Sequence, residues 1–141
     1  MGPDAFDFWV GEWDCVTEAG KAANTVTREY EGKVLVERFS ILPPQAWTGM
    51  SVSVYSELDG WRQTWVDQSG NYWNFVGQMV DGDPCFATAG RVDSDQLFKR
   101  MVFSDIEEDS LFWRWETSSD EKTVSSGVGR PRPTSPNGTS R

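Results

Sequence analysis

The sequence predicts an all-β fold, a single antiparallel up-and-down β-barrel of nine or ten strands with a short helical turn at its N-terminal end. Apolar and polar residues alternate with a period of two in one short segment after another. Turn-forming residues recur about every ten residues, as in sandwiches and barrels, and no segment has the periodicity of a long amphipathic helix. A meander of this many strands has two exposed edges unless the sheet closes, so a barrel is favoured.

The elements follow one another in a simple order. Residues 4–10 are rich in aromatic side chains and are expected to form one helical turn that plugs an opening of the barrel. The strand candidates are residues 12–17, 24–30, 34–40, 49–57, 61–67, 72–80, 84–90, 98–105, 110–117 and, as a possible tenth strand, 122–128. Asp59-Gly60 and Asp81-Gly82 tolerate positive φ and therefore predict tight hairpin connections.

The length of 141 residues is that of one ordinary domain. Residues 1–128 are expected to form the barrel. Residues 129–141 consist mainly of Gly, Pro, Ser, Thr and Arg, and their prolines cannot serve an inner strand. This segment is therefore expected to be a disordered tail.

Composition excludes several classes of function. The net charge of −9 disfavours nucleic acid as a partner. No stretch approaches the roughly 20 apolar residues of a membrane span, and no basic region precedes an apolar run, so we expect a cytoplasmic protein that does not bind membranes. Histidine is absent, which removes the usual metal and haem ligand and the usual general base. We expect no metal and no cofactor, and Cys15 and Cys85 are expected to be free and buried.

Residues 6–13, Phe-Asp-Phe-Trp-Val-Gly-Glu-Trp, contain a Gly-x-Trp motif that resembles the first-strand signature of lipocalins and their calycin relatives. Residues 31–37, 61–67 and 100–105 extend this resemblance to small bacterial lipocalin-like domains, over roughly residues 6 to 117. The resemblance implies the barrel fold, but these domains have no agreed activity. In lipocalins the signature Trp closes one end of the barrel and a late Arg packs on its face. The resemblance thus implies these structural roles for Trp13 and Arg114, with Arg130 as the alternative.

A barrel of ten strands is wide enough for a ligand cavity. Aromatic residues are more often core than pocket, yet eight Trp exceed what closure of one small barrel requires. Alternation leaves the inner face undecided, because both faces of residues 61–67 are partly apolar. The residues that we expect to contact a ligand are Trp9, Trp47, Trp61, Trp65, Trp73, Arg38, Arg62, Asn74 and Arg100.

Glu37 and Arg38 are neighbours in the middle of a strand, so one of them must point to each face of the sheet. A charge inside the barrel is costly unless it is paired, and Arg62, Arg100 and Arg114 also fall within strands. An internal carboxylate–Arg pair is therefore expected, as a structural bridge in preference to a ligand contact.

Three functions remain open at this point. The first is an intracellular protein that encloses a small hydrophobic molecule. The second is an enzyme of the isomerase, cyclase or hydratase type that uses a buried carboxylate, with Glu37, Asp67 and Tyr55 as candidate catalytic residues. The third is a structural module that pairs with a second copy as a homodimer. A carboxylate with a strongly raised pKa in a roomy cavity favours the enzyme, an uncharged apolar cavity the carrier, and a cavity too small for a ligand the module.

Overall fold

The computed structural model describes residues 1–17, 19–88, 98–108, 110–118, 125–126 and 132–134. It confirms the all-β prediction: a single 3-10 turn, η1 (Asp7–Trp9), precedes the strands of one antiparallel sheet. The strands are β1 (Gly11–Thr17), β2 (Gly20–Glu29), β3 (Val34–Ile41), β4 (Trp47–Ser56), β5 (Gly60–Asp67), β6 (Tyr72–Val80), β7 (Asp83–Thr88), β8 (Phe98–Ser104), β9 (Phe112–Ser118), β10 (Ser125–Ser126) and β11 (Arg132–Thr134).

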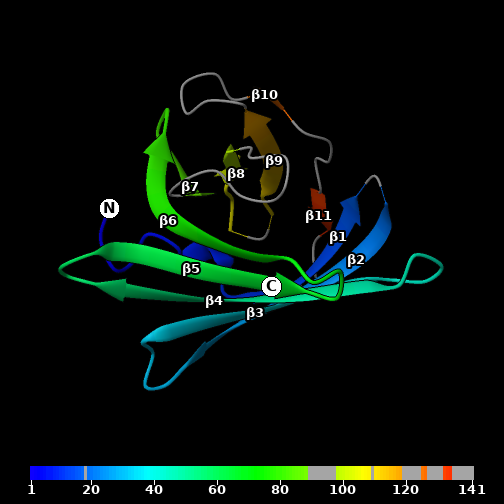
Figure 1. Cartoon of the computed structure of the whole chain (residues 1–141), viewed down its shortest axis with the longest axis horizontal. Helices are drawn as coiled ribbons and strands as arrows, with labels where there is room; N and C mark the ends of the chain where they lie inside the picture. The colour runs from blue at the N-terminus through cyan, green and yellow to red at the C-terminus, as the bar shows by residue number, and fades with distance from the viewer. Residues whose placement is uncertain (18, 89–97, 109, 119–124, 127–131, 135–141) are drawn as a thin grey trace.

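The sheet has the up-and-down order that the turn signals predict, because each strand from β1 to β9 pairs with its neighbours in sequence. The sheet curls into a half-barrel: in Figure 1, β3, β4 and β5 form one wall, β6 bends away from it, and β7, β8 and β9 lie across from it. The sheet ends at β10 and β11 in the described part of the chain. β11 pairs with β1 and also contacts β9, which brings the two ends of the sheet together.

Part of the predicted tail belongs to this sheet. Residues 132–134 form β11 and pair with β1 as an edge strand, a position that tolerates Pro133. The rest of residues 129–141, and all but Ser125 and Ser126 of the predicted strand 122–128, lie outside the described residues. Among the residues described, no helix is long and apolar enough to cross a membrane.

The pairing register decides which side chains face the inside of the curl. On β3 the buried Glu37 points inward and the exposed Arg38 points outward, as the alternation requires. On β5 the inward set is Trp61, Gln63 and Trp65. Trp61 and Gln63 are buried and Trp65 is partly buried against the core, which settles the face that the sequence left open.

One end of the curl is filled by η1 and the residues around it, as the sequence predicts. Phe6 is fully buried and stacks on Phe86, with ring centroids 4.3 Å apart and an interplanar angle of 15°. Trp61 meets Phe6 edge-on at 5.3 Å, and Trp9 lies 5.5 Å from Phe103. The closed end is this cluster of five aromatic residues, Phe6, Trp9, Trp61, Phe86 and Phe103.

Trp13 is 4% exposed, and its indole Nε1 donates a hydrogen bond to the Trp9 carbonyl at 2.9 Å. It therefore has the buried position next to η1 that the resemblance implies. The role expected of Arg114 is wrong, because its guanidinium lies on the outer face of the sheet, where it pairs with Glu116. Arg130 lies outside the described residues.

Both cysteines are buried and free, as predicted. Burial, together with the nearby Asp14 and Glu37, raises the pKa of Cys15 to about 12. Burial also raises the pKa of Cys85 to about 11. The thiols are therefore protonated at neutral pH and behave as small core residues.

Candidate functional site

A cavity of about 390 Å³ lies inside the curl, next to the closed end. It reaches the surface beside Ala19 in the β1–β2 turn, an exposed residue that forms part of its lining. Most of its wall is aromatic. The aromatic lining residues are Phe39, Trp47, Trp65, Trp73, Phe75, Phe86, Trp113 and Trp115.

Four of the five tryptophans of the wall form two stacked pairs. Trp47 and Trp65 stack with centroids 6.2 Å apart and planes 25° apart, and Trp73 and Trp115 stack at 5.6 Å and 22°. Phe39 contacts the first pair, and its ring lies 6.5 Å from that of Trp65. Each ring is held by another ring, so the wall presents fixed flat surfaces to the cavity.

A glycine under Trp65 permits this arrangement. The six-membered ring of Trp65 lies so close over Gly49 of β4 that a Cβ atom there would overlap it, and the same Cβ would lie 3.0 Å from the Cβ of Asp67. Any larger residue at position 49 would therefore push the indole ring toward the cavity. Gly49 thus sets both the position of Trp65 and the depth of the cavity.

The polar part of the wall is centred on Glu37, which is 4% exposed and lines the cavity. Asn24 donates a hydrogen bond from Nδ2 to Oε2 of Glu37 at 2.9 Å, and Ser51 donates from Oγ to Oε1 at 2.6 Å. Burial raises the pKa of Glu37 above its ordinary value of 4.5, although these two hydrogen bonds lower it in part. Burial therefore favours the neutral form of this carboxyl group.

This cluster has more acceptors than donors, because Oδ1 of Asn24 is buried and has no hydrogen-bond partner among the described residues. A second buried pair lies beside the cluster, where Gln63 donates from Nε2 to Oγ of Ser53 at 3.0 Å. Gln63 also lines the cavity. An apolar cavity with a few placed polar groups is typical of a small-molecule site.

Asp67, the last residue of β5, lines the cavity and holds the turn between β5 and β6. It accepts hydrogen bonds from the indole Nε1 of Trp65 at 2.7 Å, from the Ser69 amide at 2.9 Å, and from the side chain and amide of Asn71. Burial opposes its ionisation, but these hydrogen bonds outweigh that effect and hold its pKa below the ordinary range. Asp67 is therefore ionised and fully engaged, and it positions Trp65 and the turn.

The structure separates the five tryptophans that were predicted to contact a ligand. Trp47, Trp65 and Trp73 line the cavity. Trp9 and Trp61 do not line it: they are 2% and 4% exposed and form part of the closed end. The structure places them outside the cavity because η1 fills the space in front of them.

The predicted polar contacts Arg38, Arg62 and Asn74 also lie outside the cavity. All three side chains are exposed and alternate with inward residues of their strands, so they point outward. Arg62 makes an exposed ion pair with Asp59 at 3.5 Å. The sequence could not exclude them, because charged residues occur on either face of a partly apolar strand.

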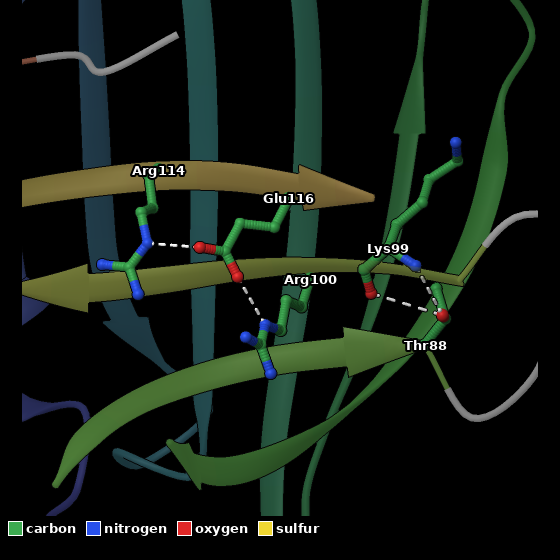
Figure 2. A network of polar contacts seen from close by, with 5 residues as sticks. All are labelled: Thr88, Lys99, Arg100, Arg114 and Glu116. Carbon is green, nitrogen blue, oxygen red and sulfur yellow. Dashed lines mark hydrogen bonds and ion pairs between the residues drawn. The ribbon is translucent and has the colours of Figure 1, made fainter. Parts of the chain in front are cut away.

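Arg100 was also expected at the ligand and lies elsewhere. Figure 2 shows Glu116 of β9 between Arg114 and Arg100, whose Nε lies 2.7 Å from Oε1 of Glu116. Burial opposes the ionisation of Glu116, but the two arginines outweigh it and hold its pKa below the ordinary range. The carboxylate–Arg pair expected inside the barrel thus lies on the outer face, and Glu37 pairs instead with Asn24 and Ser51.

The third catalytic candidate, Tyr55, does not line the cavity. Its ring centroid lies 5.8 Å from that of Trp61, beside the closed end. Sequence reasoning missed Phe39, Gln63, Trp113 and Trp115 as lining residues. The signal for the last two was present: Trp113 and Trp115 flank Arg114, and the alternation places both indoles on the face opposite the guanidinium.

Within the described part of the chain, no group of three or more Cys, Asp or Glu side chains is placed to hold a metal ion. Comparison with protein-family models finds no family that matches this sequence, and comparison with curated proteins finds no significant match. The fold and the cavity define the class of protein: an up-and-down antiparallel sheet curled around an aromatic cavity.

Proposed function

We propose that this protein is a lipocalin-like binding protein that encloses one small, largely apolar molecule in the aromatic cavity. The observation that carries the proposal is the cavity of about 390 Å³, walled by two stacked tryptophan pairs with Glu37 and Gln63 among them. Ligand pockets have this size and this mixture of apolar walls and few polar groups. The volume of the cavity also counts against a purely structural module. The homodimer and the cytoplasmic location stay predictions.

Titration with N-phenyl-1-naphthylamine, a neutral apolar fluorophore, tests this proposal. Bound in the cavity, the probe accepts excitation energy from the five lining tryptophans, so their emission falls as its own rises. Met101 also lines the cavity, and a Met101→Trp variant is expected to fill it and abolish binding. The matched control is Met50→Trp, which makes the same change on the outer face of β4, where Met50 pairs with Arg38 and Val66.

Saturable binding of one probe per chain, lost in Met101→Trp and kept in Met50→Trp, is the expected result. Equal binding by both variants would place the probe outside the cavity and contradict the proposal. Thermal unfolding of both variants shows whether each is folded.

A second function is favoured by one observation, the buried carboxyl of Glu37 in the cavity wall with a raised pKa. A group of this kind can give or take a proton near neutral pH. In an isomerase, cyclase or hydratase, Glu37→Gln would stop the conversion of the compound. A carrier would return the same compound unchanged from wild type and variant.

A further inference from the structure

We infer that the cavity selects a cationic ligand, an ammonium or alkylated ammonium group carried on an apolar or aromatic body. This inference rests on the proposed function and names the class of ligand. The described residues that line the cavity include two carboxyl groups, Glu37 and Asp67, and neither Lys nor Arg. An anionic group, such as a fatty-acid carboxylate, would meet like charge at Asp67.

The pairing register places these groups in one patch. Phe39 of β3 and Asp67 of β5 lie in one cross-strand row, and Glu37 and Trp65 lie in the next inward row. The two strands are two spacings apart, roughly 10 Å, and the β4 residues between them are a glycine and a serine. Rings and carboxyl groups thus alternate around the patch, so a cation above it approaches both kinds of group.

The rings of this patch suit a cation. The face of an indole attracts an ammonium group by about 0.5–2 kcal/mol, and the attraction is strongest where water is excluded. The hydrogen bond from Nε1 of Trp65 to Oδ2 of Asp67, at 2.7 Å, polarises the indole further and strengthens its negative face. Trp47 stacks on Trp65 and holds it in place.

A cation already lies over another tryptophan of the wall. Nζ of Lys99, a buried residue of β8, is 5.4 Å from the ring centroid of Trp73. Its ammonium group already lies over this ring. The ligand's charge is therefore assigned to the β3–β5 patch, on the Glu37 side of the cavity.

Charge selection couples binding to a proton on Glu37. Burial favours the neutral carboxyl group in the empty cavity, whereas a cation beside it favours the carboxylate. The groups packed on Glu37 are Asn24 of β2, Ser51 of β4 and the thiol of Cys15 of β1, which stays protonated with a pKa of about 12. The fixed negative charge of Asp67 on β5 adds to the attraction but does not titrate near neutral pH. Affinity for a permanent cation therefore rises as the pH increases through the raised pKa of Glu37.

The experiment uses three probes of one shape and different charge: benzyltrimethylammonium, its neutral isostere neopentylbenzene, and the anion phenylmethanesulfonate. Each is titrated into the full-length chain by tryptophan emission. The cation is expected to bind about tenfold more tightly than the neutral isostere, a difference of about 1.4 kcal/mol, and the anion most weakly. Glu37→Gln should reduce the advantage of the cation, while Glu12→Gln, the same change at an exposed position of β1, should keep it.

The pH profile of the wild-type chain is a second test that needs no variant. As the pH increases above 4.5, the ordinary pKa of a Glu carboxyl group, the affinity for benzyltrimethylammonium should rise, and that for neopentylbenzene should stay level. Equal affinity for the cation and its isostere, or a flat profile for the cation, overturns the charge selection and leaves the proposed cavity function standing. No response to any probe, N-phenyl-1-naphthylamine included, overturns both.

Discussion

The half-barrel has a closed end and an end that holds the cavity, and tryptophans have different roles at the two. At the closed end and beside it, Trp9, Trp13 and Trp61 are at most 4% exposed and pack against Phe6 or the residues of η1. At the other end, five tryptophans line the cavity. Four of them are held by stacking in pairs, and one side of each faces the cavity. The difference arises because η1 inserts its side chains at one end, and no described element does so at the other. A tryptophan is core or site according to what lies in front of it.

A glycine under a tryptophan is common to both ends. A Cβ atom at Gly77 of β6 would lie 2.7 Å from the Cβ of Trp61, and one at Gly49 would overlap the ring of Trp65. The space left by the missing side chain of Gly77 is filled by Trp61 of the core. The space left by Gly49 is filled by Trp65, whose ring then lies farther back and leaves a deeper cavity. The same close approach therefore supports stability at one end and binding at the other.

The largest effect that we predict separates the two ends by stability. Phe6→Ala should lower the free energy of unfolding by about 3–5 kcal/mol, because it empties a fully buried site stacked on Phe86. Trp113→Ala should lower it by less than about 2 kcal/mol, because this half-buried ring already borders a cavity. Denaturant unfolding measures both. Equal losses would break the comparison between the ends.

The two glycines sharpen the comparison. Gly77→Ala should cost about 1–3 kcal/mol of unfolding free energy, since a methyl group there crowds Trp61 and Phe6 in a filled core. Gly49→Ala should instead move the indole of Trp65 and weaken N-phenyl-1-naphthylamine binding more than it weakens the fold. The comparison fails if Gly49→Ala unfolds the protein as readily as Gly77→Ala and leaves probe binding unchanged.

Glu116 on the outer face tests a part of the sheet that belongs to neither end. Glu116→Gln should cost about 1–2 kcal/mol at neutral pH, since it removes a charged partner of two partly exposed arginines. The pKa of Glu116 is lowered in the folded state, so its contribution is present above the ordinary value of 4.5 and is lost as the pH falls through the lowered value. The gap between wild type and variant should therefore close in acid, while Glu57→Gln, an exposed control, should show no gap.

The alternation of residues along the chain predicts the strands well and the faces only in part. The strand predicted at residues 72–80 coincides with β6, and that at 61–67 differs from β5 by one residue. Alternation did not decide which face of residues 61–67 points inward, because Trp61 and Trp65 on one face and Val66 on the other are all apolar. Only the pairing register, which depends on contacts between distant segments, decides between them.

The candidate site shows the same limit. The sequence indicated that one of Glu37 and Arg38 is an internal charge, without deciding which, and it named Trp47, Trp65 and Trp73 together with Trp9 and Trp61, which lie outside the cavity. The partners of Glu37, Asn24 and Ser51, come from neighbouring strands at a separation of 13 and 14 residues. No local pattern predicts such a cluster, because it depends on register and on the curl of the sheet.

The smallest predicted effect concerns the outer face. Arg62→Ala should change the unfolding free energy by less than about 0.5 kcal/mol, because its ion pair with Asp59 is exposed on both sides. It should also leave the affinity for N-phenyl-1-naphthylamine unchanged. A loss of probe binding in this variant would show that Arg62 on the outer face belongs to the binding site, against the account given above.

Native mass spectrometry of the protein isolated from its own source, followed by denaturation, tests the central claim most directly. The account predicts one small, apolar, positively charged molecule per chain in wild type and in Met50→Trp, and none in Met101→Trp, whose cavity is filled. A chain that carries no molecule in any of the three forms, and whose tryptophan emission does not respond to N-phenyl-1-naphthylamine, would contradict it.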